Sequence, residues 1–126
     1  MDRFLWICFA GAAGAGTRYV IALWAAQRFG SAFPYGTLMV NLIGCFSIAA
    51  LMHAALALGW SPNLRAALTI GFIGGLITYS SFNYGTMRLV EEGAPVAAAM
   101  NVALTMRGGL MAGWLGLLAA RKVIGR

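Results

Sequence analysis

The sequence predicts an all-α integral membrane protein with four transmembrane helices, the third of them broken. Of its 126 residues, 61% are hydrophobic and only 10% are charged, whereas charged residues make up about a quarter of a typical soluble domain. A helix of about 20 apolar residues crosses a bilayer. The chain contains four such stretches, which we expect to form one membrane domain over 1–126, with helices at about 5–27, 35–58, 66–89 and 96–120. Four helices are too few to enclose a pore alone, so we also expect an oligomer.

The composition also excludes several classes of function. A net charge of +6 would suggest nucleic-acid binding in a soluble protein. Here the basic residues lie mainly near the ends of the spans, where they set orientation and contact anionic membrane lipid. The chain has one histidine and neither a nucleophile–base pair nor a cluster of metal ligands. We therefore expect a multi-pass protein of the inner (plasma) membrane, with no nucleic-acid partner and no enzymatic activity.

The first span, 5–27, carries an arginine at membrane depth, Arg18. A guanidinium group at that depth costs about 2.5–3.5 kcal/mol on insertion scales, so it usually faces a cavity or a partner. The alternative is that the side chain extends to the nearer interface. No acidic residue lies inside any predicted span, so a cavity lined by Arg18 favours an anion.

The second span, 35–58, opens with two polar residues, Thr37 and Asn41, which are four apart and therefore share a helix face. An asparagine amide in lipid needs hydrogen-bond partners, and its NH₂ group can donate to an anion. The alternative is a polar contact between helices, worth about 0.6 kcal/mol in membranes.

The third span, 66–89, is interrupted in its middle. Gly74 and Gly75 each cost roughly 1 kcal/mol relative to alanine in a helix. They are followed by three hydroxyl side chains that compete for backbone hydrogen bonds, Thr78, Ser80 and Ser81. A broken helix survives in hydrocarbon only where its backbone is satisfied, so the break predicts carbonyls free to hold a cation and hydroxyls free to meet a permeating solute. Close helix packing by small residues is the alternative.

Aromatic and polar residues continue the predicted site into the third and fourth spans. Tyr79 and Phe82 are three apart and share a face. The positive edge of an aromatic ring can coordinate an anion, although plain aromatic packing is the default. In the fourth span, 96–120, Asn101 and Thr105 are four apart and Gly109 continues their face.

Three stretches resemble the Fluc (CrcB) fluoride channels, small four-span proteins that assemble as antiparallel dimers. The third span is similar to the family segment Gly-Gly-x-Thr-Thr-Phe-Ser-Thr-Phe at Gly74, Gly75, Thr78, Ser80 and Phe82. The second span opens with Gly-Thr-Leu-Met-Val-Asn at 36–41, which matches the family's Gly-Thr-Leu-x-Val-Asn. The first contains Gly14-x-x-x-Arg18-Tyr19, which resembles the family's first helix.

The resemblance implies a passive fluoride-selective channel that exports fluoride from the cytoplasm, with two pores in each antiparallel, dual-topology dimer. It also implies one structural sodium ion at the dimer interface, held by the backbone carbonyls of Gly74 and Ile77. The expected anion pathway combines the resemblance with the polar residues already described: Arg18, Thr37, Asn41, Tyr79, Ser80, Ser81, Phe82, Asn101 and Thr105.

Three departures from the family leave a second interpretation open. Tyr79 replaces a phenylalanine, Gly85 replaces an acidic residue, and Gly109 lacks a hydroxyl found on the fourth helix. These departures suit a specialised or nonconducting half of a heterodimeric channel. A small multidrug transporter is a weaker alternative, because that class needs a carboxylate inside its first span and this one holds Arg18.

The distribution of positive charge also bears on the partner. The side that carries both termini is expected to hold Arg3, Arg65, Arg121, Lys122 and Arg126, and the other side Arg28 and Arg88. Positive residues favour the cytoplasm, so this imbalance predicts cytoplasmic termini and insertion mainly in one orientation. An antiparallel dimer would then need an oppositely oriented relative.

Overall fold

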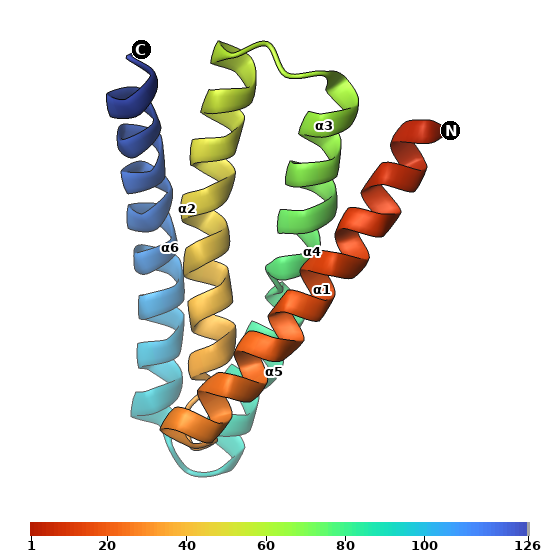
Figure 1. Ribbon diagram of the computed structural model, residues 1–126. Helices are drawn as coiled ribbons and strands as arrows, with labels where there is room; N and C mark the ends of the chain where they lie inside the picture. The colour runs from red at the N-terminus through yellow and green to blue at the C-terminus, as the bar shows by residue number, and fades with distance from the viewer. Residues whose placement is uncertain (126) are drawn as a thin grey trace.

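The computed structural model describes residues 1–125, and the secondary structure of these residues is all helical (Figure 1). Helices α1 (Asp2–Phe29), α2 (Tyr35–Ala57) and α6 (Pro95–Ile124) are each long and apolar enough to cross a membrane. The third span is assembled from shorter pieces, α3 (Pro62–Ala66), the π-helix η1 (Ala67–Ile73), α4 (Gly74–Leu76) and α5 (Tyr79–Glu91). The prediction of an all-α protein with a broken third span is therefore confirmed.

The helix ends follow from local sequence. Pro62 and Pro95 lie in the first turns of α3 and α6, where the missing N–H of proline costs nothing. The Ser61 hydroxyl accepts a hydrogen bond from the Leu64 N–H at 3.2 Å, which caps α3. In the turn before it, Gly59 has a φ of 65°, a conformation that favours glycine.

Glycines allow the helices to approach closely in two places. On α6, a side chain at Gly116 would collide with the Phe46 carbonyl of α2, and these two helices run side by side (Figure 1). Where α1 crosses the third span, a side chain at Gly75 would collide with the Gly11 carbonyl, and one at Gly14 with the Phe72 carbonyl. Gly75 therefore permits close helix packing, which was the alternative for this glycine.

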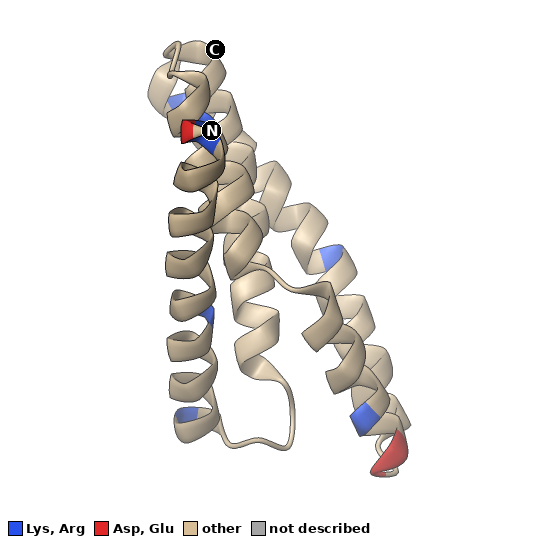
Figure 2. Ribbon diagram, turned by 90° about the vertical axis from the view of Figure 1, so that its right-hand side faces the viewer, with Lys and Arg blue, Asp and Glu red and all other residues tan. Residues whose placement is uncertain are grey.

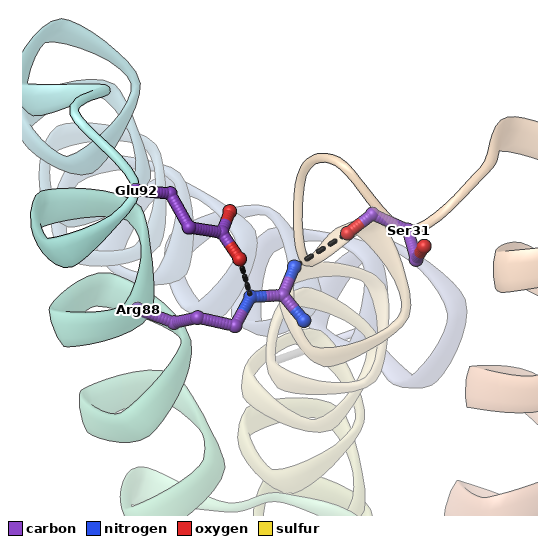
Figure 3. Close-up of polar contacts among 3 residues, drawn as sticks. All are labelled: Ser31, Arg88 and Glu92. Atoms are coloured by element: carbon purple, nitrogen blue, oxygen red, sulfur yellow. Dashed lines mark hydrogen bonds and ion pairs between the residues drawn. The ribbon is translucent and has the colours of Figure 1, made fainter.

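The described charged residues lie at both ends of the molecule and along its length. Both termini lie at one end (Figure 1), where the Arg3 Nε donates to Asn63 Oδ1 at 3.2 Å. At the other end, the guanidinium group of Arg88 donates to the Ser31 carbonyl, and its Nε lies 3.4 Å from Glu92 Oε1 (Figure 3). Figure 2 shows basic residues at both ends of the bundle and along its length. Arg126, which entered the predicted charge count, lies outside the described residues.

Candidate functional site

The break in the third span lies at Ile77 and Thr78. Ile77 has φ −79° and ψ 155°, and Thr78 has φ −153° and ψ 119°, so both are extended. Gly74 and Gly75, in contrast, form the helical turn α4 just before the break. The break therefore lies at the C-terminal end of the predicted segment, and the glycines are not its extended residues.

Asn41 of α2 satisfies the backbone at the break. Its Oδ1 accepts the Thr78 N–H at 2.8 Å, and its Nδ2 donates to the Thr78 carbonyl at 3.1 Å. In a continuous helix the Thr78 N–H would instead donate to the carbonyl four residues earlier, that of Gly74. Asn41 thus takes the donor that the Gly74 carbonyl would otherwise use.

The Thr78 side chain has the same effect one turn later. Its hydroxyl accepts the Ser81 N–H at 3.2 Å and caps α5. It also lies 3.2 Å from the hydroxyls of Ser80 and Ser81. In a continuous helix the Ser81 N–H would donate to the Ile77 carbonyl. Gly74 and Ile77, the two residues expected to supply carbonyls to a cation, have thus both lost their helical donors.

A cavity of about 390 Å³ lies beside the break, between α2, α5 and α6, and its polar and aromatic lining includes Asn41, Tyr79, Phe82 and Thr105. The two rings meet edge to face, with centroids 5.6 Å apart. Phe82 is only 6% exposed, whereas Tyr79 is 73% exposed, so the described chain leaves the tyrosine ring uncovered. Within residues 1–125, the buried Thr105 Oγ1 has no hydrogen-bond partner and can donate to a solute.

Arg18 lines a second hollow of about 280 Å³, together with Thr37, Thr78 and Ser81. Thr78 also lines the cavity beside the break, so the two spaces meet at this residue. A third hollow, of about 480 Å³, shares Thr37 and Ser81 with the second and adds Ser80. The structure therefore brings together eight of the nine residues expected on the anion pathway.

Asn101 is the exception. It is 1% exposed, and its Nδ2 donates to the Thr86 Oγ1 at 2.9 Å, which joins α6 to α5. It lines none of the three spaces described above. Thr86 was not predicted as its partner, because the two residues lie on different spans and neither position in the sequence points to the other.

Two further residues were missed as part of the site. Thr78 was predicted as a hydroxyl at the break, free to meet a solute, but was not placed on the anion pathway; it bonds through three of its atoms and lies between two of the spaces. Arg88 was counted only for orientation, but it lines the third hollow. Their hydroxyl and guanidinium groups were visible in the sequence. Their positions depend on the break and on the α1–α2 connection.

The fold and this site define a class of protein, a multi-pass membrane channel whose broken third span lies beside a polar and aromatic cavity. The family model for the CrcB-like protein, Camphor Resistance (CrcB), matches residues 5–117. The chain belongs to this CrcB/FluC family of membrane channels, so the prediction of a channel and not an enzyme is confirmed.

Curated relatives extend the similarity over nearly the full chain. The chain is 47% identical over 125 residues to the "Fluoride-specific ion channel FluC" of Sorangium cellulosum (strain So ce56), covering 98% of both proteins. It is 44% identical over 126 residues to the protein of that name from Anaeromyxobacter sp. (strain K), covering 99% of this chain and 100% of the relative. The corresponding protein of Geotalea uraniireducens (strain Rf4) is 43% identical over 122 residues. This membership does not favour the small multidrug transporter.

Proposed function

We propose that the chain is a subunit of a passive fluoride-selective channel that exports fluoride from the cytoplasm. The observation that carries the proposal is the cavity beside the break, where Asn41, Tyr79, Phe82 and Thr105 line one space. The fluoride specificity in the names of its full-length relatives supports the choice of ion.

The lining suits an anion at each point along the pathway. Arg18 supplies a positive charge at the second hollow, where it raises the local concentration of anions. Asn41 uses one amide hydrogen on the Thr78 carbonyl and keeps a second for a solute. Thr105 adds a hydroxyl, and the edges of Tyr79 and Phe82 offer weak positive charge. Fluoride must shed a tenacious water shell and then leave quickly, so several modest donors serve it better than one strong site.

The site requires a second subunit, and we propose an antiparallel dimer. Gly74, Ile77 and Tyr79 are exposed around the break, so a partner placed there would close the pathway. Arg107 is exposed inside α6 and has no hydrogen bond or ion pair within residues 1–125. Because an uncovered guanidinium is costly at membrane depth, this arginine also argues for a partner or a water-filled surface.

The proposed dimer holds one sodium ion between the two breaks. The donors of the Gly74 and Ile77 carbonyls are diverted to Asn41 and Thr78, so these oxygens can face a cation. The Ile77 side chain packs where Gly44 of α2 leaves room, so it need not enter a carbonyl site. The ion would balance the partial negative charge on four carbonyl oxygens, those of Gly74 and Ile77 in each subunit, and would so hold the two subunits together.

Fluoride efflux from liposomes that contain the purified chain alone tests the proposal, and we expect rapid efflux. Asn41→Asp should cut it strongly, because a negative charge replaces a donor on the pathway. Phe82→Ile should slow it, because the ring edge is lost. Wild-type rates in both variants would place the pathway elsewhere, and no efflux from a folded chain would refute the homodimeric channel.

A second candidate is one half of a heterodimeric channel, favoured by the uneven distribution of positive charge. Among the described residues, Arg3, Arg65, Arg121 and Lys122 are assigned to the side of the termini, against Arg28 and Arg88 on the other. Cysteine labelling at both termini in intact cells would measure the orientation. Roughly equal inside and outside populations, or efficient efflux by this chain alone, would refute the heterodimer.

A further inference from the structure

We propose that Asn41 and Thr78 are positioning residues for the interfacial cation, because they release the carbonyls that would bind it. The inference rests on the sodium site proposed above. It assigns Asn41 a second role besides donation to the anion, and it gives the Thr78 hydroxyl a role in cation binding without contact to the ion.

Two backbone donors at the break use side-chain acceptors in place of helical carbonyls. Two N–H groups would bond the Gly74 and Ile77 carbonyls in a continuous helix, those of Thr78 and Ser81. Each has a side-chain acceptor instead, Asn41 Oδ1 at 2.8 Å and Thr78 Oγ1 at 3.2 Å. Without these acceptors, the N–H groups would be unpaired inside the bundle or would return to the helical carbonyls. Either outcome works against the open arrangement of the break.

The surroundings of the break fit this assignment. Gly74 is exposed, and a methyl group on it would meet only the Thr69 carbonyl, at 3.9 Å, so its surface is open to a partner. Asn41 is bonded to Thr78 in both directions, which fixes its amide in one orientation. Asn41 thus connects the two proposed functions, because it contacts the break and lines the cavity.

The test measures sodium binding and not fluoride flux. The purified chain in detergent is unfolded by heat in a series of buffers in which sodium chloride increasingly replaces N-methyl-D-glucamine chloride. The dimer fraction is measured in the same buffers. A ligand that binds only the native state raises stability with concentration, so the wild type should give a saturating rise in midpoint temperature. Asn41→Leu and Thr78→Val keep the approximate shape of the side chains and remove the acceptors. Both variants should need at least tenfold more sodium to reach half of their rise in midpoint temperature.

Matched variants separate this role from general damage. Thr78→Ser keeps the hydroxyl, and Asn41→Asp keeps an acceptor for the Thr78 N–H. The sodium concentration that gives half of the stabilisation should therefore lie within about threefold of the wild-type value for both variants. Asn41→Asp should nevertheless lose fluoride flux, which separates the cation role from the anion role. Thr69→Val is the control within the same span, because the Thr69 hydroxyl donates to the Arg65 carbonyl four residues earlier and diverts no backbone donor.

The outcomes distinguish the inference from the proposal beneath it. If the wild type responds to sodium and Thr78→Val and Asn41→Leu respond equally, the positioning role is refuted and the sodium site stands. If the wild type shows no response, the sodium site and this inference are both refuted, while the efflux assay still tests the channel. If Asn41→Leu does not fold, Thr78→Val alone decides, with Thr78→Ser as its reference.

Discussion

Two adjacent glycines of α4 should respond oppositely to the same substitution. A methyl group on Gly75 would collide with the Gly11 carbonyl of α1 and lie 3.1 Å from the Ala15 nitrogen. Both obstacles are backbone atoms, which cannot rotate away, so α1 would have to move off the third span. A methyl group on Gly74 meets nothing closer than the Thr69 carbonyl, at 3.9 Å.

The magnitudes follow from two opposing effects. Overpacking costs about 1–3 kcal/mol, and we take the upper end for Gly75 because the obstacle is backbone. Glycine to alanine in a helix gains about 1 kcal/mol. Gly75→Ala should therefore lower the free energy of unfolding by about 2 kcal/mol, a roughly 30-fold change in the folding equilibrium. Gly74→Ala should leave it unchanged or raise it by up to about 1 kcal/mol.

The assay is reversible unfolding of the purified chain in mixed detergent and dodecyl sulfate micelles, followed by the fluorescence of its four tryptophans. Sodium-free buffer removes any contribution from the proposed cation site. Equal stability of Gly74→Ala and Gly75→Ala would refute the close approach of α1 to the third span. A lower stability of Gly74→Ala alone would indicate that a partner already covers that face under the conditions of the assay.

Three further predictions concern single side chains. Tyr79→Phe should speed fluoride efflux by roughly tenfold or more if the phenolic hydroxyl retains the anion, since a hydrogen bond to a charged group is worth about 1.5–3 kcal/mol. Unchanged efflux would exclude that hydroxyl from the rate-limiting step. Thr105→Val should slow efflux by roughly tenfold, because it removes a buried, unpartnered hydroxyl from the cavity, and wild-type efflux would contradict its place on the pathway. Thr86→Val should destabilise the chain by about 1–3 kcal/mol, because the buried Asn101 amide loses its acceptor. The double variant Thr86→Val/Asn101→Leu should recover most of that loss, and a loss as large as in the single variant would show that the hydrogen bond is not the cause.

Much of the site could be predicted from residue type and spacing. Apolar length gave the membrane helices, and the hydroxyls after Gly75 marked the region of the break. Asn41 and Thr105 were assigned to one pathway from different spans, and the structure brings both to one cavity. Residue type and spacing could indicate this grouping because hydrocarbon tolerates polar groups only where they are satisfied; the pathway itself stays a prediction. Asn101 fits the same rule, but its partner is Thr86 and not the cavity.

The sequence by itself determined that this chain is a multi-pass membrane protein with an interrupted third span, and its polar residues led us to expect an anion. Only the tertiary structure decided what each residue does at the break. Gly75 permits α1 to approach, while Asn41 and Thr78 hold the extended segment. The physical reason is that glycine propensity and hydroxyl chemistry are local properties. The acceptor that a diverted N–H finds depends on which helix lies beside it, and here Asn41 is 37 residues away from Thr78 in the chain.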